Sequence, residues 1–141
     1  MKNQQIDYSQ LYEGYKFSPA IFKLEAALVR DYIEAVEETS TLYQDTRLVP
    51  PMAVVTLAMA ALSQSVSFPY GAIHVSQEVE FLKAAHMDDT IMSQATVTKK
   101  QKRGPLNLLT IEFRALDKDA QGVVTGKTEF ILPEPTVPGT V

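Results

Sequence analysis

Residues 50–66 read PPMAVVTLAMAALSQSV, and this stretch decides the fold. Proline suits the first turn of a helix, where a backbone N–H has no partner to lose. The residues that follow are apolar at nearly every position as far as Gln64, so a helix formed here has almost no polar face to turn to water. The sequence therefore predicts a central helix that the rest of the chain wraps.

Four predicted strands follow this helix. Each alternates apolar and polar residues, and the turns between them contain Asp, Gly or Pro; the strands are residues 74–82, 90–102, 106–116 and 123–132. Before the central helix, residues 24–37 carry apolar side chains at helical spacing, and residues 14–23 resemble an irregular first strand because Pro19 confines them to a sheet edge.

Strands gathered after helices and joined by short turns indicate an α+β fold with an antiparallel sheet. A curled antiparallel sheet wrapped around one apolar helix is the hot-dog fold. We expect a single domain over residues 1–141, with its core at about 14–133 and with residues 1–13 and 134–141 as extended ends.

Composition excludes several classes of function. The chain has 141 residues, 45% of them hydrophobic, a net charge of −4, no cysteine and two histidines. The absence of cysteine removes disulfides, thiolate chemistry and iron–sulfur ligation, and two histidines leave too few ligands for a multi-histidine metal site. An acidic balance gives no reason to expect nucleic acid, and no apolar run approaches the ~20 residues that span a bilayer. Together with a first segment that does not read as a signal peptide, this favours a cytoplasmic protein.

Several short motifs resemble the MaoC-like hydratase/dehydratase family, and especially its fungal fatty-acid-synthase-like dehydratase branch. They keep the order and spacing of the family's motifs: YIEAV at 32–36, LYQD at 42–45, VPPM at 49–52, HVSQEVEF at 74–81, DT at 89–90 and KRG at 102–104. The resemblance runs from about Gly14 to Pro133. It implies a hot-dog fold and an acyl thioester substrate carried on coenzyme A or phosphopantetheine, with no separate cofactor.

The family's catalytic loop is altered in this chain. Active members read G-D-x-N-P-x-H, and their Asp and His activate a water for addition to an enoyl thioester, or run the reverse reaction. Here the aligned residues 37–43 are EETSTLY, so Glu38 stands at the Asp position and Tyr43 at the His position. A phenol with a pKa near ~10 carries protons poorly at neutral pH, and an extra methylene displaces the carboxylate. The resemblance therefore points to the branch's non-catalytic subunits, which pair with an Asp/His-bearing chain.

The same resemblance suggests which residues bind substrate. The first turn of the central helix, at Pro51, Met52 and Ala53, has free N–H groups that can polarise a thioester carbonyl. Hot-dog thioesterases commonly carry a carboxylate on this helix, and residues 52–66 contain none, which counts against a thioesterase.

Other candidate residues have two interpretations each. His74 is either a catalyst or a hydrogen-bonded structural residue. Tyr43 and Asp45 form a polar pair at the mouth of the groove, or Tyr43 packs its ring and Asp45 helps cap the next turn. Lys102 and Arg103, in a basic run beginning at Lys99, attract coenzyme A phosphates or an acidic carrier protein, or they are solvated side chains at a strand end.

Three functions remain open on the sequence. The first is a non-catalytic subunit of a (3R)-hydroxyacyl-thioester dehydratase or enoyl-CoA hydratase, working as a heterodimer with a second hot-dog chain. The second is a stand-alone hydratase or thioesterase with a non-standard site built from Glu38, Tyr43 or His74. The third is a homodimer that binds an acyl ligand without catalysis. A dimer is expected in each case, because one hot dog leaves a sheet edge open.

Overall fold

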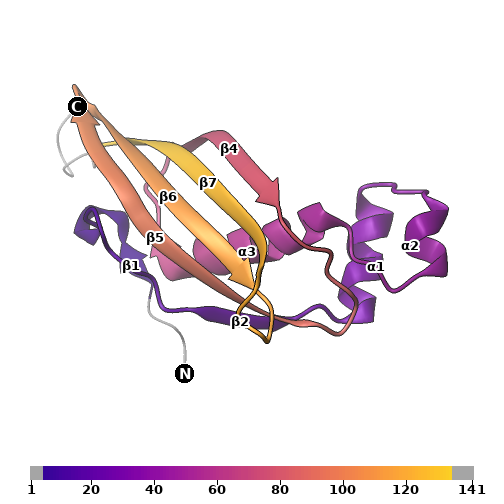
Figure 1. Cartoon of the computed structure of the whole chain (residues 1–141). Helices are drawn as coiled ribbons and strands as arrows, with labels where there is room; N and C mark the ends of the chain where they lie inside the picture. The colour runs from indigo at the N-terminus through magenta and orange to yellow at the C-terminus, as the bar shows by residue number, and fades with distance from the viewer. Residues whose placement is uncertain (1–4, 135–141) are drawn as a thin grey trace.

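The computed structural model describes residues 5–134 and contains a five-stranded antiparallel sheet with one long helix against it (Figure 1). The strand order is β2-β5-β6-β7-β4. The strands are β2 (Ala20–Lys23), β4 (Ile73–Phe81), β5 (Thr90–Arg103), β6 (Leu106–Leu116) and β7 (Gly122–Pro133). The three later strands follow one another as hairpins, as their period-2 patterns and turns predict, and β4 returns to the outside of β7.

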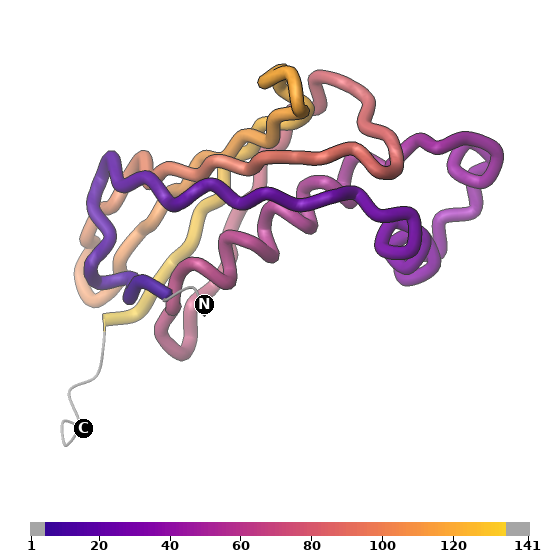
Figure 2. Tube along the Cα trace, turned by 90° about the horizontal axis from the view of Figure 1, so that it is seen from below, coloured from indigo at the N-terminus to yellow at the C-terminus, as the bar shows by residue number. Residues whose placement is uncertain are grey.

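The central helix α3 (Pro51–Ser65) runs along one face of this sheet (Figure 2). Its sheet-facing side chains are buried against apolar residues of the strands, such as Ile91, Ile111 and Val124; the buried helix residues are Ala53, Val54, Val55, Ala58 and Leu62. The opposite side of α3 is not covered, and Pro51, Met52, Thr56 and Ala60 are exposed there. The predicted α+β hot-dog architecture is confirmed, but a single chain covers the apolar helix on the sheet side only.

Two short helices lie at the end of the molecule where α3 begins. They are α1 (Ala26–Ala35) and α2 (Thr41–Asp45). The predicted helix over residues 24–37 is therefore correct in type and about two residues too long at each end. α2 was not predicted, because five residues are too few to show a period; the Ser40 side chain starts it by accepting a hydrogen bond from the Leu42 N–H.

The N-terminal segment is part of the core, so the prediction of an extended end over residues 1–13 is wrong for its second half. Strand β1 (Ile6–Asp7) pairs in parallel with β3 (Val66–Ser67), and a short 3-10 helix, η1 (Tyr8–Gln10), follows. Tyr8 and Leu11 are only 5% and 2% exposed, because they fill the space beside the last turn of α3. Most of the predicted C-terminal extended end lies outside the described residues.

No helix within residues 5–134 is both long enough and apolar enough to cross a membrane. Over the same range, no three His, Asp or Glu side chains are grouped so that they could hold a metal ion.

Candidate functional site

The first turn of α3 is held in place by a neighbouring loop. The Val49 N–H donates to the Ala85 carbonyl at 2.9 Å and the Met87 N–H donates to the Arg47 carbonyl at 2.7 Å, so residues 47–49 lie against residues 85–87. The chain then turns at Pro50 and enters the helix at Pro51. Two consecutive prolines remove two of the N–H groups that usually point out of a helix start.

One backbone donor remains free at this helix start. The Ala53 N–H donates to the Pro50 carbonyl at 2.9 Å, whereas the Met52 N–H has no partner among residues 5–134. No side chain of that range caps α3, and its first turn holds no acidic residue. Of the predicted binding residues Pro51, Met52 and Ala53, the structure therefore leaves Met52 with an N–H that can reach a carbonyl oxygen, at the positive end of the helix dipole.

The loop that corresponds to the family's catalytic loop begins with a tight helix end. The Glu37 N–H donates to Glu34 and the Glu38 N–H donates to Ile33, a Schellman motif that requires a left-handed residue at position 37. Glu37 takes that conformation, with a φ of 56°. The family's G-D-x-N-P-x-H pattern has glycine at this position, and the geometry gives the physical reason.

The Glu38 carboxylate is engaged within this loop. Its Oε1 accepts a hydrogen bond from the Ser40 N–H at 2.9 Å, and the side chain is exposed to solvent. Tyr43 is half-buried on α2. The Glu38 carboxylate therefore supports the turn before α2.

Asp45 does not cap the turn that follows it, so that interpretation is wrong. Asp45 is the last residue of α2, and its carboxylate makes no hydrogen bond to any described residue. Thr46 holds the turn instead: its hydroxyl donates to the Leu42 carbonyl at 2.5 Å and accepts from the Leu48 N–H at 3.2 Å.

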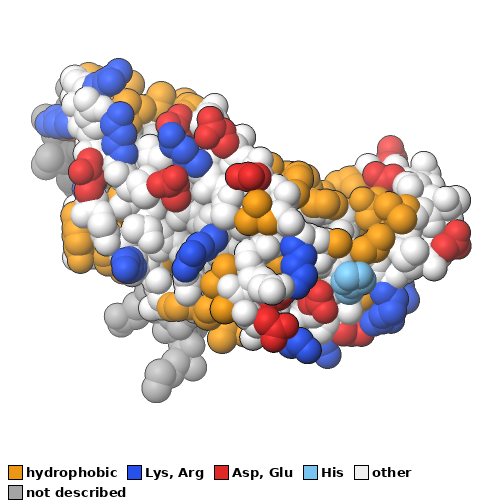
Figure 3. Space-filling view, viewed as in Figure 1, with side chains coloured by type: hydrophobic (Ala, Val, Ile, Leu, Met, Phe, Trp, Pro, Cys, Tyr) orange, Lys and Arg blue, Asp and Glu red, His pale blue; other side chains and the backbone are white. Residues whose placement is uncertain are grey.

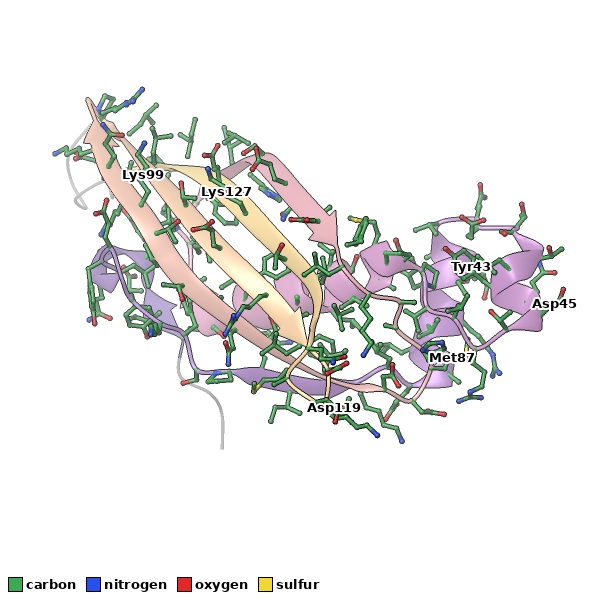
Figure 4. All side chains as sticks on the ribbon, in the orientation of Figure 1. Tyr43, Asp45, Met87, Lys99, Asp119 and Lys127 are labelled. Atoms are coloured by element: carbon green, nitrogen blue, oxygen red, sulfur yellow. The ribbon has the colours of Figure 1, made fainter. Side chains whose placement is uncertain are left out.

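The remaining candidates lie at the opposite end of the fold (Figure 4). Tyr43 and Asp45 come from α2 at one end, whereas Lys99 lies toward the other end, on the strand that carries Lys102 and Arg103. Because β5 has 14 residues, its two ends are about 45 Å apart. The Lys102 Nζ also lies 2.5 Å from a Glu134 carboxylate oxygen. Within one chain, Lys102 and Arg103 therefore lie toward the opposite end of the fold from the first turn of α3, which holds Met52.

His74 is also remote from the first turn of α3. It is the second residue of β4, which begins beyond the far end of α3, a helix about 22 Å long. Its ring lies 5.0 Å from that of Phe130, and its Nε2 is 3.0 Å from the Ser76 carbonyl oxygen. These contacts favour the structural interpretation of His74, and the structure does not bring it together with Glu38 or Tyr43.

The space between α3 and the sheet is filled. The cavity found there has a volume of about 20 Å³, which has room for about one water molecule and is far too small for an acyl chain. A larger hollow of about 910 Å³ lies on the outer face of the sheet, where charged side chains including Lys127, Glu112 and Arg114 line it. Neither of these two cavities is an apolar tunnel, so neither offers an acyl chain a channel within residues 5–134 of one copy.

Apolar surface is exposed near the first turn of α3. Figure 3 shows a band of hydrophobic side chains in the hollow between the end of β4 and helices α1 and α2. Large hydrophobic residues exposed on these elements include Leu42, Met52 and Phe81. Sequence reasoning missed Leu42 and Phe81, because an exposed apolar residue in a periodic pattern looks like a core residue.

The curled antiparallel sheet with one helix along its face defines a hot-dog protein. The solved R-hydratase PhaJ1 of Pseudomonas aeruginosa has this architecture, with a TM-score of 0.77 at 18% identity, covering 97% of this chain and 96% of that chain. The (R)-hydratase of A. caviae involved in PHA biosynthesis gives a TM-score of 0.73 at 21% identity, covering 88% and 98%. The HadBC (3R-hydroxyacyl-ACP dehydratase) complex of Mycobacterium tuberculosis gives 0.68 at 17%, covering 84% and 96%. At these identities the likeness shows a shared fold.

The family is shown by the sequence itself. Residues 12–126 match the family described as FAS1-like, dehydratase domain region, and the chain belongs to this family. The predicted family is therefore confirmed over most of the chain. No curated protein matches.

Proposed function

We propose that this chain is an acyl-thioester-binding subunit of a (3R)-hydroxyacyl-thioester dehydratase or enoyl-thioester hydratase, and that a second hot-dog chain supplies the Asp/His pair. The observation that carries the proposal is the altered catalytic loop. Glu38 stands at the Asp position with its carboxylate bonded to the Ser40 N–H, and Tyr43 stands at the His position. The Glu38 carboxylate is held in the turn, and a tyrosine hydroxyl is a poor substitute for imidazole as a proton carrier at neutral pH.

The first turn of α3 supports the binding half of the proposal. The free Met52 N–H at the positive end of the helix donates to the thioester carbonyl oxygen, and this interaction strengthens as negative charge builds on that oxygen. The acyl chain lies along the open face of α3, past Thr56 and Ala60, because the layer between helix and sheet has no room for it.

The open face of α3 also explains why a second chain is needed. An acyl chain on the open side of α3 is half in water unless another molecule covers it, and burying apolar surface is what stabilises such a complex. A covering hot-dog chain also brings its own catalytic loop to the bound thioester. Two-component assembly of a dehydratase of this fold is seen in the HadBC complex.

A turnover assay tests the proposal. The purified chain alone is mixed with crotonyl-CoA, and we expect no hydration. A second hot-dog chain that carries the Asp/His loop is then added, and hydration should appear in proportion to the complex formed. Hydration by the chain alone that is lost in Glu38→Gln would contradict the proposal and favour a stand-alone hydratase.

Substitutions in the complex separate the two subunits. Removing an acid or base typically costs about 10²–10⁴-fold in rate. Replacing the partner's Asp or His should therefore abolish turnover, whereas Glu38→Gln and Tyr43→Phe in this chain should each change kcat by less than about threefold. A loss of about 100-fold in either variant of this chain would place the chemistry here instead.

A further inference from the structure

Gln77 on β4 has a buried polar atom that no group within residues 5–134 satisfies. Its Oε1 accepts a hydrogen bond from Thr128 Oγ1 at 2.9 Å, and its Nε2 is buried without a partner in that range. Turning the amide over exchanges the two atoms and leaves the oxygen unpaired instead. A buried amide atom without a partner is unfavourable, so its presence in a folded protein needs an explanation.

The side chain of Gln77 faces α3. Gln77 and Thr128 are opposite each other on neighbouring antiparallel strands, so their side chains share one face of the sheet. Thr128 is 0% exposed, and its Oγ1 lies 3.5 Å from the Sδ of Met59 on α3. Met59 therefore packs against this polar pair. Because a methionine side chain is unbranched and flexible, it can move aside without a change in the backbone.

Met59 belongs to a stripe of α3 that starts at the proposed thioester site. Met52, Thr56, Met59 and Ser63 follow one another at steps of four, three and four residues, a spacing that places side chains on one face of a helix. Met52, Thr56 and Ser63 are exposed, whereas Met59 is partly buried and contacts Thr128. The stripe therefore runs along the border between the open face of α3 and the sheet.

The polar pair lies farther along α3 than the thioester carbonyl. Met59 comes seven residues after Met52, which is roughly 10 Å along a helix and about the reach of an extended chain of eight carbons. On β4, the residues that share the face of Gln77 toward the start of α3 are Val79 and Phe81, both apolar. An acyl chain held at Met52 therefore passes apolar side chains before it reaches the amide of Gln77.

A hydroxyl group is the ligand that suits this amide. If the nitrogen of Gln77 is the unpaired end, it donates to the hydroxyl oxygen, and if the oxygen is the unpaired end, it accepts the hydroxyl proton. A plain alkyl chain leaves the amide unsatisfied in either orientation. A carboxylate would bury a charge beside Gln77, Thr128 and Met59, none of which is a cation.

We propose that Gln77 is a specificity-determining residue, whose amide hydrogen-bonds a hydroxyl group on the acyl chain about eight carbons from the thioester carbonyl. Thr128 holds the amide in place, and Met59 moves aside to admit this part of the chain. The inference rests on the proposed function and names the class of its substrate, an acyl thioester with a second oxygen function far from the carbonyl.

Calorimetry with octanoyl-CoA and 8-hydroxyoctanoyl-CoA tests the inference, on this chain in complex with the Asp/His-bearing chain. Wild type should bind the hydroxylated thioester about tenfold or more tightly, because a site that hydrogen-bonds a hydroxyl is left unpaired by the analogue without it. Gln77→Met keeps the length of the side chain and removes both amide atoms. It should bind octanoyl-CoA the more tightly of the two, because a hydroxyl buried without a partner is unfavourable.

The matched control is Gln101→Met. Gln101 also has a buried amide atom without a partner among the described residues, but it lies on β5, which β6 and β7 separate from β4. This variant should keep the wild-type preference. Equal affinities of wild type for the two thioesters, or a preference that survives in Gln77→Met, would overturn the inference and leave thioester binding intact. If wild type binds neither thioester, the proposed function fails and this inference fails with it.

Discussion

Phe113 on β6 lies directly opposite Gly126 on β7, and its ring occupies the space where a side chain at position 126 would be. A Cβ added to Gly126 would overlap the ring atoms Cε1 and Cζ. Phe113 is itself buried in the cluster beneath α3. Overpacking of this kind costs about 1–3 kcal/mol, so Gly126→Ala should lower the free energy of unfolding by that amount, measured by urea denaturation.

The companion variant Phe113→Leu tests the cause. If the ring of Phe113 is what excludes a side chain at position 126, the two substitutions are coupled. The double variant Phe113→Leu/Gly126→Ala should then lose less free energy of unfolding than the sum of the losses in the two single variants. Additive losses would mean that the glycine serves the strand in some other way.

The second prediction concerns the helix end before the catalytic loop. Glu37 has a left-handed backbone, which costs a non-glycine residue about 1–2 kcal/mol. Glu37→Gly should therefore raise the free energy of unfolding by about 1 kcal/mol. The control Glu34→Gly, three residues earlier within α1, should lower it by about the same amount, because glycine is unfavourable inside a helix. A loss of stability in both variants would show that the Schellman motif is not formed in solution.

The third prediction concerns the N-terminal segment. Leu11 is buried and the Lys100 Nζ donates to its carbonyl oxygen at 2.8 Å, so Leu11→Ala should cost about 2–5 kcal/mol of unfolding free energy. The Tyr8 hydroxyl donates to the Pro133 carbonyl at 3.3 Å, and burial raises its pKa. Tyr8→Phe should cost only about 0.5–1.5 kcal/mol. Thermal melts that leave Leu11→Ala unchanged would mean that residues 6–11 do not pack on the core.

The burial of this N-terminal segment could not be predicted from the sequence. The central helix and the four later strands were predicted within one or two residues, because each has many apolar residues at a fixed period. Tyr8 and Leu11 are separated by polar residues in a segment with no period, and their burial depends on the far end of α3. From its local composition alone, this segment was therefore predicted to be an exposed end.

The candidate site was predicted only in part for a similar reason. Glu38, Tyr43 and Met52 came from motifs close together in the chain, and the structure places all three at the end of the molecule where α3 begins. Lys102, Arg103 and His74 also came from motifs, but their place depends on the direction in which β4 and β5 run. The exposed apolar band that includes Leu42 and Phe81 is formed by side chains from three elements. It can therefore be recognised only once these elements are placed in the fold.

The fourth prediction is a pH dependence at the β6–β7 turn. The Lys83 ammonium lies 2.5 Å from Asp117 Oδ2, and the Asp119 and Gln121 N–H groups donate to Oδ1 at 2.9 Å. The Lys83 side chain, followed by the Gln121 backbone, holds the pKa of Asp117 below its ordinary value of 3.8. The stabilisation is therefore complete above about pH 5 and is lost as the pH falls through the lowered pKa.

Asp117→Asn should flatten the fall of the melting temperature between about pH 5 and pH 2. Because Asp117 also accepts two backbone N–H groups, Asp117→Ala should lose more stability at pH 7 than Lys83→Ala does. A larger loss in Lys83→Ala would place the stabilisation in contacts of the lysine stem.

The fifth prediction tests the first turn of α3 as a thioester site. Met52 and Leu28 are both 42% exposed, and both lie in the first turn of a helix. A glutamate there interacts favourably with the helix dipole, so Met52→Glu and Leu28→Glu should fold with nearly unchanged melting temperatures. At position 52 the new carboxylate competes with the thioester carbonyl oxygen for the free N–H. Its negative charge also repels that oxygen. Butyryl-CoA binding, measured by calorimetry on the complex with the Asp/His-bearing chain, should therefore weaken about tenfold or more in Met52→Glu and stay unchanged in Leu28→Glu. Equal affinities in the two variants would move the thioester away from α3.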